Sequence, residues 1–367
     1  SAEENEAFLY LSRHFLEQDL PVPRILHIAE DRLSYIVEDL GDTTLFSILE
    51  RSRGAAQFEQ IIRPHYRRVI EDLIAFQTRG ARGIDFSRCY PLPTFDRNAI
   101  QWDLSYFKYY FLRLAGIEFN EARLQAGFDQ LTDNLLQQPA GYFMHRDFQS
   151  RNIMLKDGQY VYIDYQGGRS GPLSYDLASL LFNSRADLSP AFREEMLDHY
   201  IQSAGEVLEG RDDSFRKAFR SMAVLRVLQA MGAYGYRGYF QRKALFLSGI
   251  PFGLRNLASL LGHPDTQLEP YLMEVLLKLS QSPMDIQGPP TGLTLWIQSF
   301  SYRYGIPADP GGHGGGFVFD CRALPNPGRD PSLAGHTGRD AEVAGFLEGR
   351  PEVEDFLQHA LALVRYA

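Results

Sequence analysis

Cysteine and long apolar runs are scarce in this chain, and each shortage excludes a class of protein. Only two cysteines, Cys89 and Cys321, occur among 367 residues, so we expect neither a disulfide framework nor a paired-cysteine metal site. No uncharged apolar run reaches the roughly 18 residues of a membrane span, and the acidic segment SAEENE at residues 1–6 is unlike a secretion signal. The expected setting is a reducing cytoplasm, without a membrane partner.

Positive charge is also in short supply. The chain has 37 Lys and Arg against 46 Asp and Glu, a net charge of −9. Proteins that bind nucleic acid through its phosphates carry the opposite balance, so the charge does not favour RNA as a partner. With 44% hydrophobic and 23% charged residues, the composition is that of a globular protein with an apolar core.

Glycine and proline mark a boundary late in the chain. Residues 286–367 contain 13 of the 32 glycines, and residues 282–292 read SPMDIQGPPTG. Neither a helix nor a strand tolerates that composition. We therefore predict a domain break at 283–292.

Apolar periodicity predicts the elements on either side of this break. We expect a helix over 4–18, a hairpin over 24–40, helices over 44–140, short strands over 141–171 and helices over 175–279. Beyond the break we expect strands at 293–300 and 317–319 and one or two helices over 343–366. An aromatic-rich helical face is expected to lie in the core: Trp102, Tyr106, Phe107, Tyr110 and Phe111.

The most informative segment runs from residue 143 to residue 180. Two short apolar runs flank KDGQ at 156–159, and Asp157-Gly158 is a pair favoured in two-residue type I′ turns. A tight hairpin in that register pairs Ile153 with Tyr162, and so brings Asn152 and Asp164 side by side at its open end.

A third oxygen-bearing side chain belongs to the same region. Asp147 lies five residues before Asn152, on the loop that leads to the same end of the hairpin. A few hard oxygen ligands, completed by water and phosphate, suit Mg²⁺. His145 and Arg146 complete the pattern H-R-D-x-x-x-x-N, the spacing with which kinases place a catalytic Asp and a metal-binding Asn.

Turn chemistry is the alternative explanation for any one of these residues. A single Asp or Asn in a turn commonly bonds its own neighbouring backbone. The joint presence of the H-R-D motif, the Asn at its offset, the Asp-Gly turn and a second Asp after the strand favours phosphoryl transfer.

The same motifs resemble those of the aminoglycoside phosphotransferase and choline kinase group, and HRDFQSRNIM, IDYQ and GPLSYDLASLL are most similar to anomeric N-acetylmuramate/N-acetylglucosamine kinases. The resemblance implies an α+β, protein-kinase-like fold of two lobes. It implies that Asp147 is the catalytic base, that His145 and Arg146 brace its loop, and that Asn152 and Asp164 bind Mg²⁺. Tyr165-Gln166 after the metal Asp is unlike a protein kinase.

Further roles follow from the resemblance alone. Asp176 would stabilise the catalytic loop, although an acid in a first helical turn is equally explained by the helix dipole. Glu4 would be the ion-pairing helix Glu or a solvated residue, and Glu38-Asp39-Leu40 would form the hinge that binds the adenine of ATP. The family's Gly-rich loop and strand Lys have no counterpart before Glu4, and because the three oxygen residues are kept, we expect a fragment rather than a degraded kinase.

Contacts to the acceptor substrate are harder to assign. Tyr165, Gln166 and Arg169 follow the metal Asp and are candidates, but packing and turn roles explain them equally well. An acidic sugar would need a cation such as Arg169 or Arg151.

The segment from residue 293 to residue 367 resembles the C-terminal domain of the RNase adapter RapZ. The resemblance rests on the runs DCRALPNP and TGRD and implies an α/β domain that senses an amino-sugar phosphate. The family's later glycine-rich loop has no counterpart before Ala367, so we expect this domain to be truncated.

Together these patterns predict three parts: an incomplete small lobe at 1–41, a large helical lobe at 42–282 and the α/β domain at 293–367. The predicted function is that of an ATP- and Mg²⁺-dependent sugar kinase of cell-wall recycling with a sugar-phosphate-sensing domain. Two alternatives stay open, an aminoglycoside- or choline-type kinase and a non-catalytic sensor or RNA adapter that uses the kinase lobe as a scaffold.

Overall fold

The computed structural model describes residues 1–282, 317–333, 336 and 340–364. The chain forms two compact units, Ser1–Thr294 and Leu295–Ala367, which we treat separately. The break predicted at 283–292 and the strand predicted at 293–300 lie outside the described residues. Within them, no helix is long and apolar enough to cross a membrane.

A helix and a hairpin open the first unit. Helix α1 (Ala2–Glu17) buries Phe8 and Phe15 on one face, as their spacing predicts. Strand β1 (Ile25–Ile28) pairs antiparallel with β2 (Tyr35–Val37). The predicted helix and hairpin are thus confirmed.

Three two-stranded sheets, including β1–β2, hold the described strands. Strand β3 (Tyr142–Met144) pairs with β6 (Arg169–Gly171), and β4 (Ile153–Lys156) pairs with β5 (Gln159–Tyr162) after a 3₁₀ turn, η3 (Ser150–Asn152).

The register of the β4–β5 hairpin is the predicted one, since Ile153 is opposite Tyr162. Asp157 and Gly158 have φ values of 50° and 77°. A type I′ turn requires positive φ at both positions, so the turn prediction is confirmed as well.

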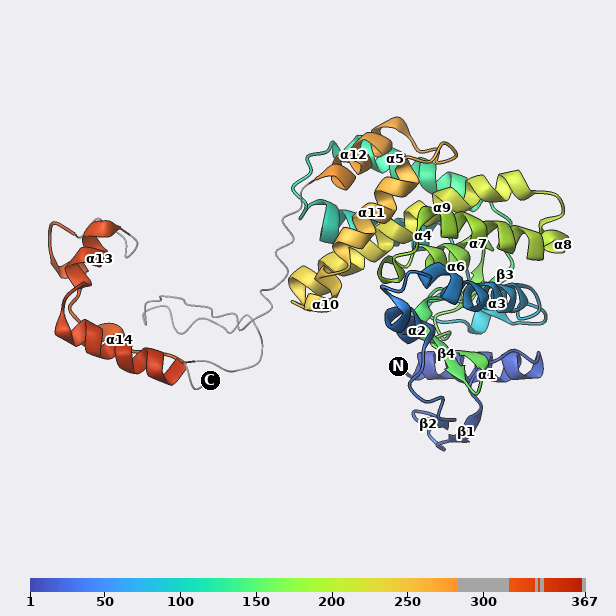
Figure 1. Ribbon diagram of the computed structural model, residues 1–367, viewed down its shortest axis with the longest axis horizontal. Helices are drawn as coiled ribbons and strands as arrows, with labels where there is room; N and C mark the ends of the chain where they lie inside the picture. The colour runs from blue at the N-terminus through green and yellow to red at the C-terminus, as the bar shows by residue number, and fades with distance from the viewer. Residues whose placement is uncertain (283–316, 334–335, 337–339, 365–367) are drawn as a thin grey trace. The chain divides into compact units, whose positions relative to one another are not determined.

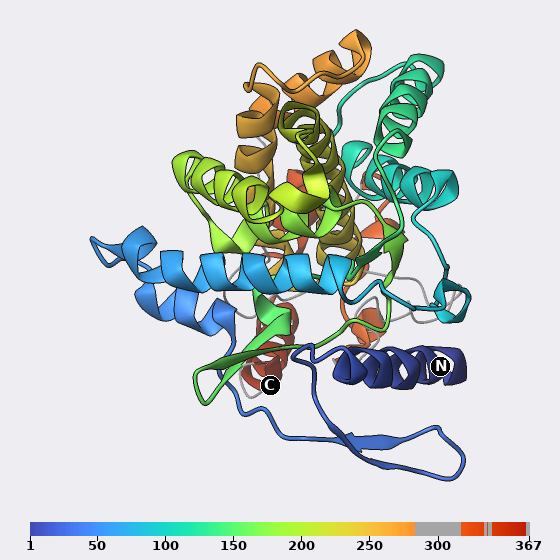
Figure 2. The ribbon, with the colours of Figure 1, turned by 90° about the vertical axis from the view of Figure 1, so that its right-hand side faces the viewer.

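The β4–β5 hairpin joins the N-terminal elements to the rest of the unit. The backbone N–H of Leu155 donates to Thr43 O at 2.8 Å, and that of Tyr162 donates to Pro21 O at 2.9 Å. Both views place α1 and the two hairpins at one end of the unit (Figure 1, Figure 2).

Helices make up the rest of the first unit, as predicted for 44–140 and 175–279. Two of them, η2 and η5, are π-helices, and η1 and η4 are 3₁₀ turns. In chain order these elements are α2 (Leu45–Ser52), α3 (Phe58–Thr78), η1 (Phe86–Arg88), α4 (Arg97–Phe107), η2 (Lys108–Leu112), α5 (Glu121–Leu136), α6 (Ser174–Leu181), η4 (Ser184–Ala186), α7 (Pro190–Ser203), α8 (Gly205–Leu208), α9 (Asp212–Tyr234), η5 (Gly235–Phe240), α10 (Ala244–Leu247), α11 (Ile250–Leu261) and α12 (Pro270–Gln281).

Helix α9 is central to the packing of this unit, with α4, α5, α6 and α11 against it (Figure 2). Leu225 and Leu228 of α9 are fully buried. At its C-terminal end, glycine lets the backbones approach closely: a Cβ at Gly232 would lie 2.9 Å from Phe107 N, and one at Gly235 would lie 1.9 Å from Tyr110 O. The close fit of α9 and η5 against α4 and η2 therefore depends on these glycines.

One part of the predicted aromatic core is wrong. Phe107 and Phe111 are fully buried, but Trp102 is 61% exposed, and Tyr106 and Tyr110 are only half-buried. The buried stripe of α4 carries Ile100, Leu104 and Phe107, and Trp102 lies off that stripe.

The described part of the second unit is helical. Helices α13 (Ala341–Leu347) and α14 (Pro351–Val364) follow two 3₁₀ turns, η7 (Cys321–Ala323) and η8 (Pro327–Arg329). The prediction of helices over 343–366 is confirmed up to residue 364. The buried strand predicted at 317–319 is wrong, because this segment has no strand pairing and Phe317 and Val318 are about half exposed.

The packing of η5 against η2 leads to a first prediction. Replacing Gly235 by Ala should lower the free energy of unfolding by about 1–3 kcal/mol, because the new methyl group meets the backbone oxygen of Tyr110 and only a main-chain shift can relieve the clash. Chemical denaturation measures this. Gly205→Ala is the matched control: nothing lies within 4 Å of its Cβ, so a helical Ala there should be neutral or stabilising by up to about 1 kcal/mol. Equal effects of the two substitutions would contradict the packing argument.

Candidate functional site

The loop after β3 carries His145, Arg146 and Asp147, and a buried carboxylate holds it. Asp176 of α6 is fully buried. Its Oδ2 accepts from the backbone N–H of His145 at 2.7 Å, and its Oδ1 accepts from that of Arg146 at 2.9 Å. Asp176 thus makes the loop-supporting contact expected of it, and burial raises its pKa to about 7.

The backbone of this region is strained at two places. Arg146 and Asp164 have φ values of 76° and 67°, a region that side-chain-bearing residues enter at a cost of about 1–3 kcal/mol each. The Arg146 guanidinium lies 3.4 Å from Oδ1 of Asp103 on α4. Such strain persists only where the surroundings impose it, and at Arg146 the Asp176 bonds and the Asp103 ion pair do so.

Buried His145 packs rather than reaching out to solvent. Its ring is 1% exposed and lies edge-on to Phe148, at a centroid distance of 5.5 Å. Neither ring nitrogen has a hydrogen-bond partner among the described residues. Burial lowers the pKa of the ring, which favours a neutral imidazole beneath the loop.

The structure brings together three of the predicted oxygen-bearing residues. The Asn152 amide nitrogen donates to Asp164 Oδ2 and to the backbone oxygen of Asp147, each at 2.9 Å. The Gln166 amide donates to the other Asp164 oxygen at 2.9 Å. Asp164 is exposed and Asp147 is half-buried, so both carboxylates are accessible from the open end of the hairpin.

The donor set at this end fits a magnesium ion that also binds phosphate. Asn152 and Asp164 supply oxygens from adjacent side chains, and Mg²⁺ typically takes one or two protein ligands and completes its shell with water and phosphate. No group of three or more His, Cys, Asp and Glu side chains in the described ranges could hold a metal on its own. A metal here would therefore depend on ligands from a substrate.

The segment predicted as a hinge is held by a lysine from the β4–β5 hairpin. Lys156 Nζ donates to Asp39 O at 2.7 Å and lies 3.6 Å from Glu38 Oε1. Glu38 also pairs with Arg24, at 2.6 Å. None of the described residues accepts a hydrogen bond from the backbone N–H of Leu40.

Among the described residues, the side-chain ion pair and the capping bonds of Glu4 are made with Ser1. Glu4 is the third residue of α1, and its backbone N–H donates to the Ser1 hydroxyl at 3.2 Å in a capping box. The predicted ion-pairing role stays a prediction.

Two predicted substrate contacts are corrected by their burial. Tyr165 is fully buried, with its hydroxyl 2.6 Å from that of Ser12 and its ring against Phe8 and Phe15 at 5.4 Å. Tyr165 therefore packs against the apolar face of α1 and joins this helix to the segment that follows Asp164.

Arg169 is likewise fully buried, in β6. It donates to Gly167 O from Nε and Nη2 at 3.3 and 3.2 Å, and burial, together with the charge of Arg146, lowers its pKa to about 10. Arg151 is exposed, with its guanidinium 4.6 Å from the Phe46 ring. Of the four predicted acceptor contacts, Gln166 and Arg151 are the two that remain accessible.

Sequence reasoning missed Asp103 and Lys156. An isolated acid in the aromatic-rich helix of residues 97–107 was a signal for Asp103, which is 6% exposed. Lys156 had no such signal, because its hinge contact lies 117 residues away in sequence.

The comparisons with known proteins agree with this geometry. Residues 1–212 match the model of the phosphotransferase enzyme family, which is more than half of the chain. The chain belongs to this family. The protein is therefore a phosphotransferase, and the predicted family and protein-kinase-like fold are confirmed. Residues 293–367 match the model of the RapZ C-terminal domain, which confirms the second resemblance.

Individual relatives can be named. The chain is 29% identical over 249 residues to the N-acetylmuramate/N-acetylglucosamine kinase of Neisseria meningitidis serogroup B, across 66% of this chain and 71% of that protein. The protein of the same name from Pseudomonas aeruginosa is 27% identical over 267 residues, across 71% and 74%. A solved Plasmodium vivax ethanolamine kinase covers 70% of this chain and 72% of its own, with 14% identity and a TM-score of 0.48.

The brace at Asp176 leads to a second prediction. Asp176→Asn leaves one of the two loop N–H groups facing an amide NH₂, which should lower the free energy of unfolding by about 1–3 kcal/mol. The stability difference between the protein and this variant should also depend on pH. Between the ordinary Asp pKa of 3.8 and about 7, the unfolded chain has released the proton that the folded protein keeps, so the contribution of Asp176 falls as pH rises.

Chemical denaturation of both proteins at pH 5, 6, 7 and 8 measures this dependence. The difference should shrink from pH 5 to pH 7 and level off above. A difference that stays constant over the whole range would show that Asp176 is ionised throughout.

Proposed function

We propose that this protein transfers the γ-phosphoryl group of ATP to the anomeric hydroxyl of N-acetylmuramate or N-acetylglucosamine in the cytoplasm. The observation that carries the proposal is the convergence of Asp147, Asn152 and Asp164 at the open end of one hairpin, on a loop held by Asp176. The names of the two relatives aligned over most of the first unit supply the acceptor class.

The chemistry assigned to Asp147 is that of a general base. The acceptor hydroxyl would donate its proton to the Asp147 carboxylate as its oxygen forms a bond to the γ-phosphorus and the bond to the β,γ-bridging oxygen breaks, releasing ADP. None of the described residues donates a hydrogen bond to this carboxylate, since the Asn152 amide donates to the backbone oxygen of Asp147 instead. The carboxylate is therefore available to the acceptor. Most of the catalysis would come from positioning and charge stabilisation.

Asn152 and Asp164 would hold magnesium, which supplies charge neutralisation at the phosphates when it is bound. The Gln166 amide orients one Asp164 oxygen and the Asn152 amide the other, each at 2.9 Å. These two contacts hold the orientation of the Asp164 carboxylate.

The hinge would bind the adenine ring through its backbone. Lys156 fixes the chain at Asp39 by a 2.7 Å hydrogen bond, and the N–H of Leu40 next along the chain is free to donate. Glu38 and Asp39 themselves would contribute main chain rather than side chains, since the Glu38 carboxylate is engaged by Arg24 and Lys156.

The acceptor would meet Gln166 and Arg151. Arg151 is exposed and shares the Phe46 ring with Arg185, whose guanidinium lies 5.1 Å from it. Arg185 is paired with Glu50 at 3.5 Å, which leaves Arg151 as the cation that would meet an acceptor carboxylate, such as the lactyl group of N-acetylmuramate.

For the second unit we propose that residues 293–367 bind an amino-sugar phosphate. The family match supports this proposal, and loss of binding on removal of residues 293–367 would test it.

The third prediction tests the reaction. ADP release with Mg·ATP should be stimulated by N-acetylmuramate or N-acetylglucosamine and not by glucosamine, choline or kanamycin. Asp147→Asn should lower kcat by about 10²–10⁴, the usual contribution of a general base. Asp157→Asn is the matched control, because Asn-Gly forms the same type I′ turn and residue 157 is exposed at the far end of the hairpin.

Two other outcomes of this assay would replace the proposed function. Turnover of choline or kanamycin alone would replace the sugar by an amine acceptor. No turnover with any acceptor, and no binding of Mg·ATP, would favour the non-catalytic sensor.

The fourth prediction concerns the metal. Chelation by EDTA should abolish ADP release, and Asp164→Asn should raise the Mg²⁺ concentration needed for half-maximal rate by tenfold or more, because it removes the only charged ligand. Gln166→Leu should have a smaller effect, since Gln166 only orients Asp164. Equal Mg²⁺ dependence of the Asp164 variant and the unchanged protein would refute the metal assignment.

A further inference from the structure

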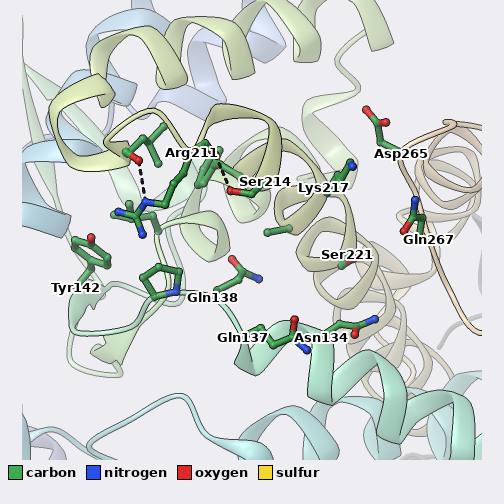
Figure 3. Close-up of a pocket in the computed structure, with 15 residues that line it drawn as sticks. Asn134, Gln137, Gln138, Tyr142, Arg211, Ser214, Lys217, Ser221, Asp265 and Gln267 are labelled. Carbon is green, nitrogen blue, oxygen red and sulfur yellow. Dashed lines mark hydrogen bonds between the residues drawn. The ribbon is translucent and has the colours of Figure 1, made fainter.

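A second pocket lies in the first unit, away from the phosphoryl-transfer site. It occupies about 1170 Å³, including the solvent at its mouth, between the C-terminal end of α5, the segment that leads into β3, the first half of α9 and the loop before α12 (Figure 3). None of Asp147, Asn152 and Asp164 lines it. The pocket meets β3 at Tyr142, at the opposite end of the strand from the catalytic loop.

Uncharged polar side chains converge on this pocket from different elements. Four of these side chains have no hydrogen-bond partner among the described residues: the amides of Asn134, Gln137 and Gln267 and the hydroxyl of Ser221. The Gln138 amide nitrogen is buried and also unpartnered. Amides and hydroxyls both donate and accept, which matches the hydroxyl groups of a carbohydrate.

Hydrogen bonds from residues that do not line the pocket hold its walls in place. The Ser174 hydroxyl donates to the Gln138 side-chain oxygen, which turns the unpartnered Gln138 nitrogen to the other side. Gln77 donates to Leu173 O at 2.8 Å and accepts from Tyr200, whose ring stacks on Phe215 at 5.3 Å. A preformed wall of this kind lowers the entropic cost of binding.

The charge of the pocket selects an anion. Arg211 and Lys217 line it against one carboxylate, Asp265. Arg211 also lies 3.6 Å from the exposed carboxylate of Glu209, which does not line the pocket. Arg211 is oriented by its hydrogen bonds to Leu208 O at 2.9 Å and to Val207 O at 3.1 Å. These two bonds leave three of its five N–H groups able to donate to a ligand. The Lys217 ammonium has no partner in the part of the chain that the structure describes. Figure 3 shows Arg211, which directly precedes α9, and Lys217, which lies within it, at different places around the pocket.

We propose that this pocket binds a monosaccharide that carries a phosphate or carboxylate group. Its hydroxyls would meet the amides of α5 and of the segment that leads into β3, its ring the faces of Tyr142 and Phe215, and its anionic group the positive wall of α9. The proposal is independent of the kinase reaction, since it rests on residues outside the phosphoryl-transfer site.

Titration calorimetry of the full chain without ATP tests the proposal. The probes are N-acetylglucosamine 1-phosphate, glucuronate, neutral N-acetylglucosamine and inorganic phosphate. One or both charged sugars should bind at least tenfold more tightly than the neutral sugar and than inorganic phosphate. Lys217→Glu and Asn134→Asp, which add negative charge from α9 and α5, should each weaken binding about tenfold or more. Lys278→Glu makes the same charge change at an exposed residue of α12 outside the pocket, where the lysine pairs with Glu274; it should not weaken binding.

The variants also separate this site from the others. Lys217→Glu should leave ADP release and the melting temperature unchanged, because Lys217 is exposed and makes no described contact. Binding that is equal in the protein and in both pocket variants would place the ligand elsewhere and overturn the proposal. So would the absence of binding of every probe at millimolar concentration, or binding of inorganic phosphate as tight as that of both charged sugars.

Discussion

The site depends on one buried carboxylate. Asp176 is the only acceptor that both His145 and Arg146 share among the described residues, and it holds their N–H groups with its two oxygens. A strained φ at Arg146 is maintained because those bonds and the Asp103 ion pair outweigh its cost. Asp147 follows these two residues directly, so the Asp176 brace and the hydrogen bond from Asn152 to the Asp147 backbone oxygen together fix its position.

The β4–β5 hairpin has two functions in the fold. Its open end brings Asn152 to Asp164, and its closed end carries Lys156 to the predicted hinge. The same hairpin is hydrogen-bonded to residues 21 and 43, so the N-terminal elements and the catalytic loop are positioned by one small piece of sheet. Tyr165, directly after Asp164, completes this joint by packing under α1.

Much of this arrangement could be predicted from local patterns. The Asp-Gly turn determines the hairpin register, and the register determines which residues end side by side. Periodicity identified α1 and the helices of the large part. The same methods failed at Trp102, Tyr165 and Arg169, because exposure depends on what lies opposite a side chain. An aromatic residue on a helix and an Arg after a strand have no local signal for their burial.

The sequence by itself determined the family, the hairpin and the set of residues that meet at its open end, because these follow from short-range spacing and turn chemistry. Only the tertiary structure decided that Asp176 holds the loop of residues 145–147, that Lys156 contacts residues 38 and 39, and that Tyr165 and Arg169 are buried. It alone brought together α5, the segment leading into β3 and α9 around the second pocket. Those contacts join residues tens of positions apart, and their geometry is set by how the helices pack rather than by any local pattern.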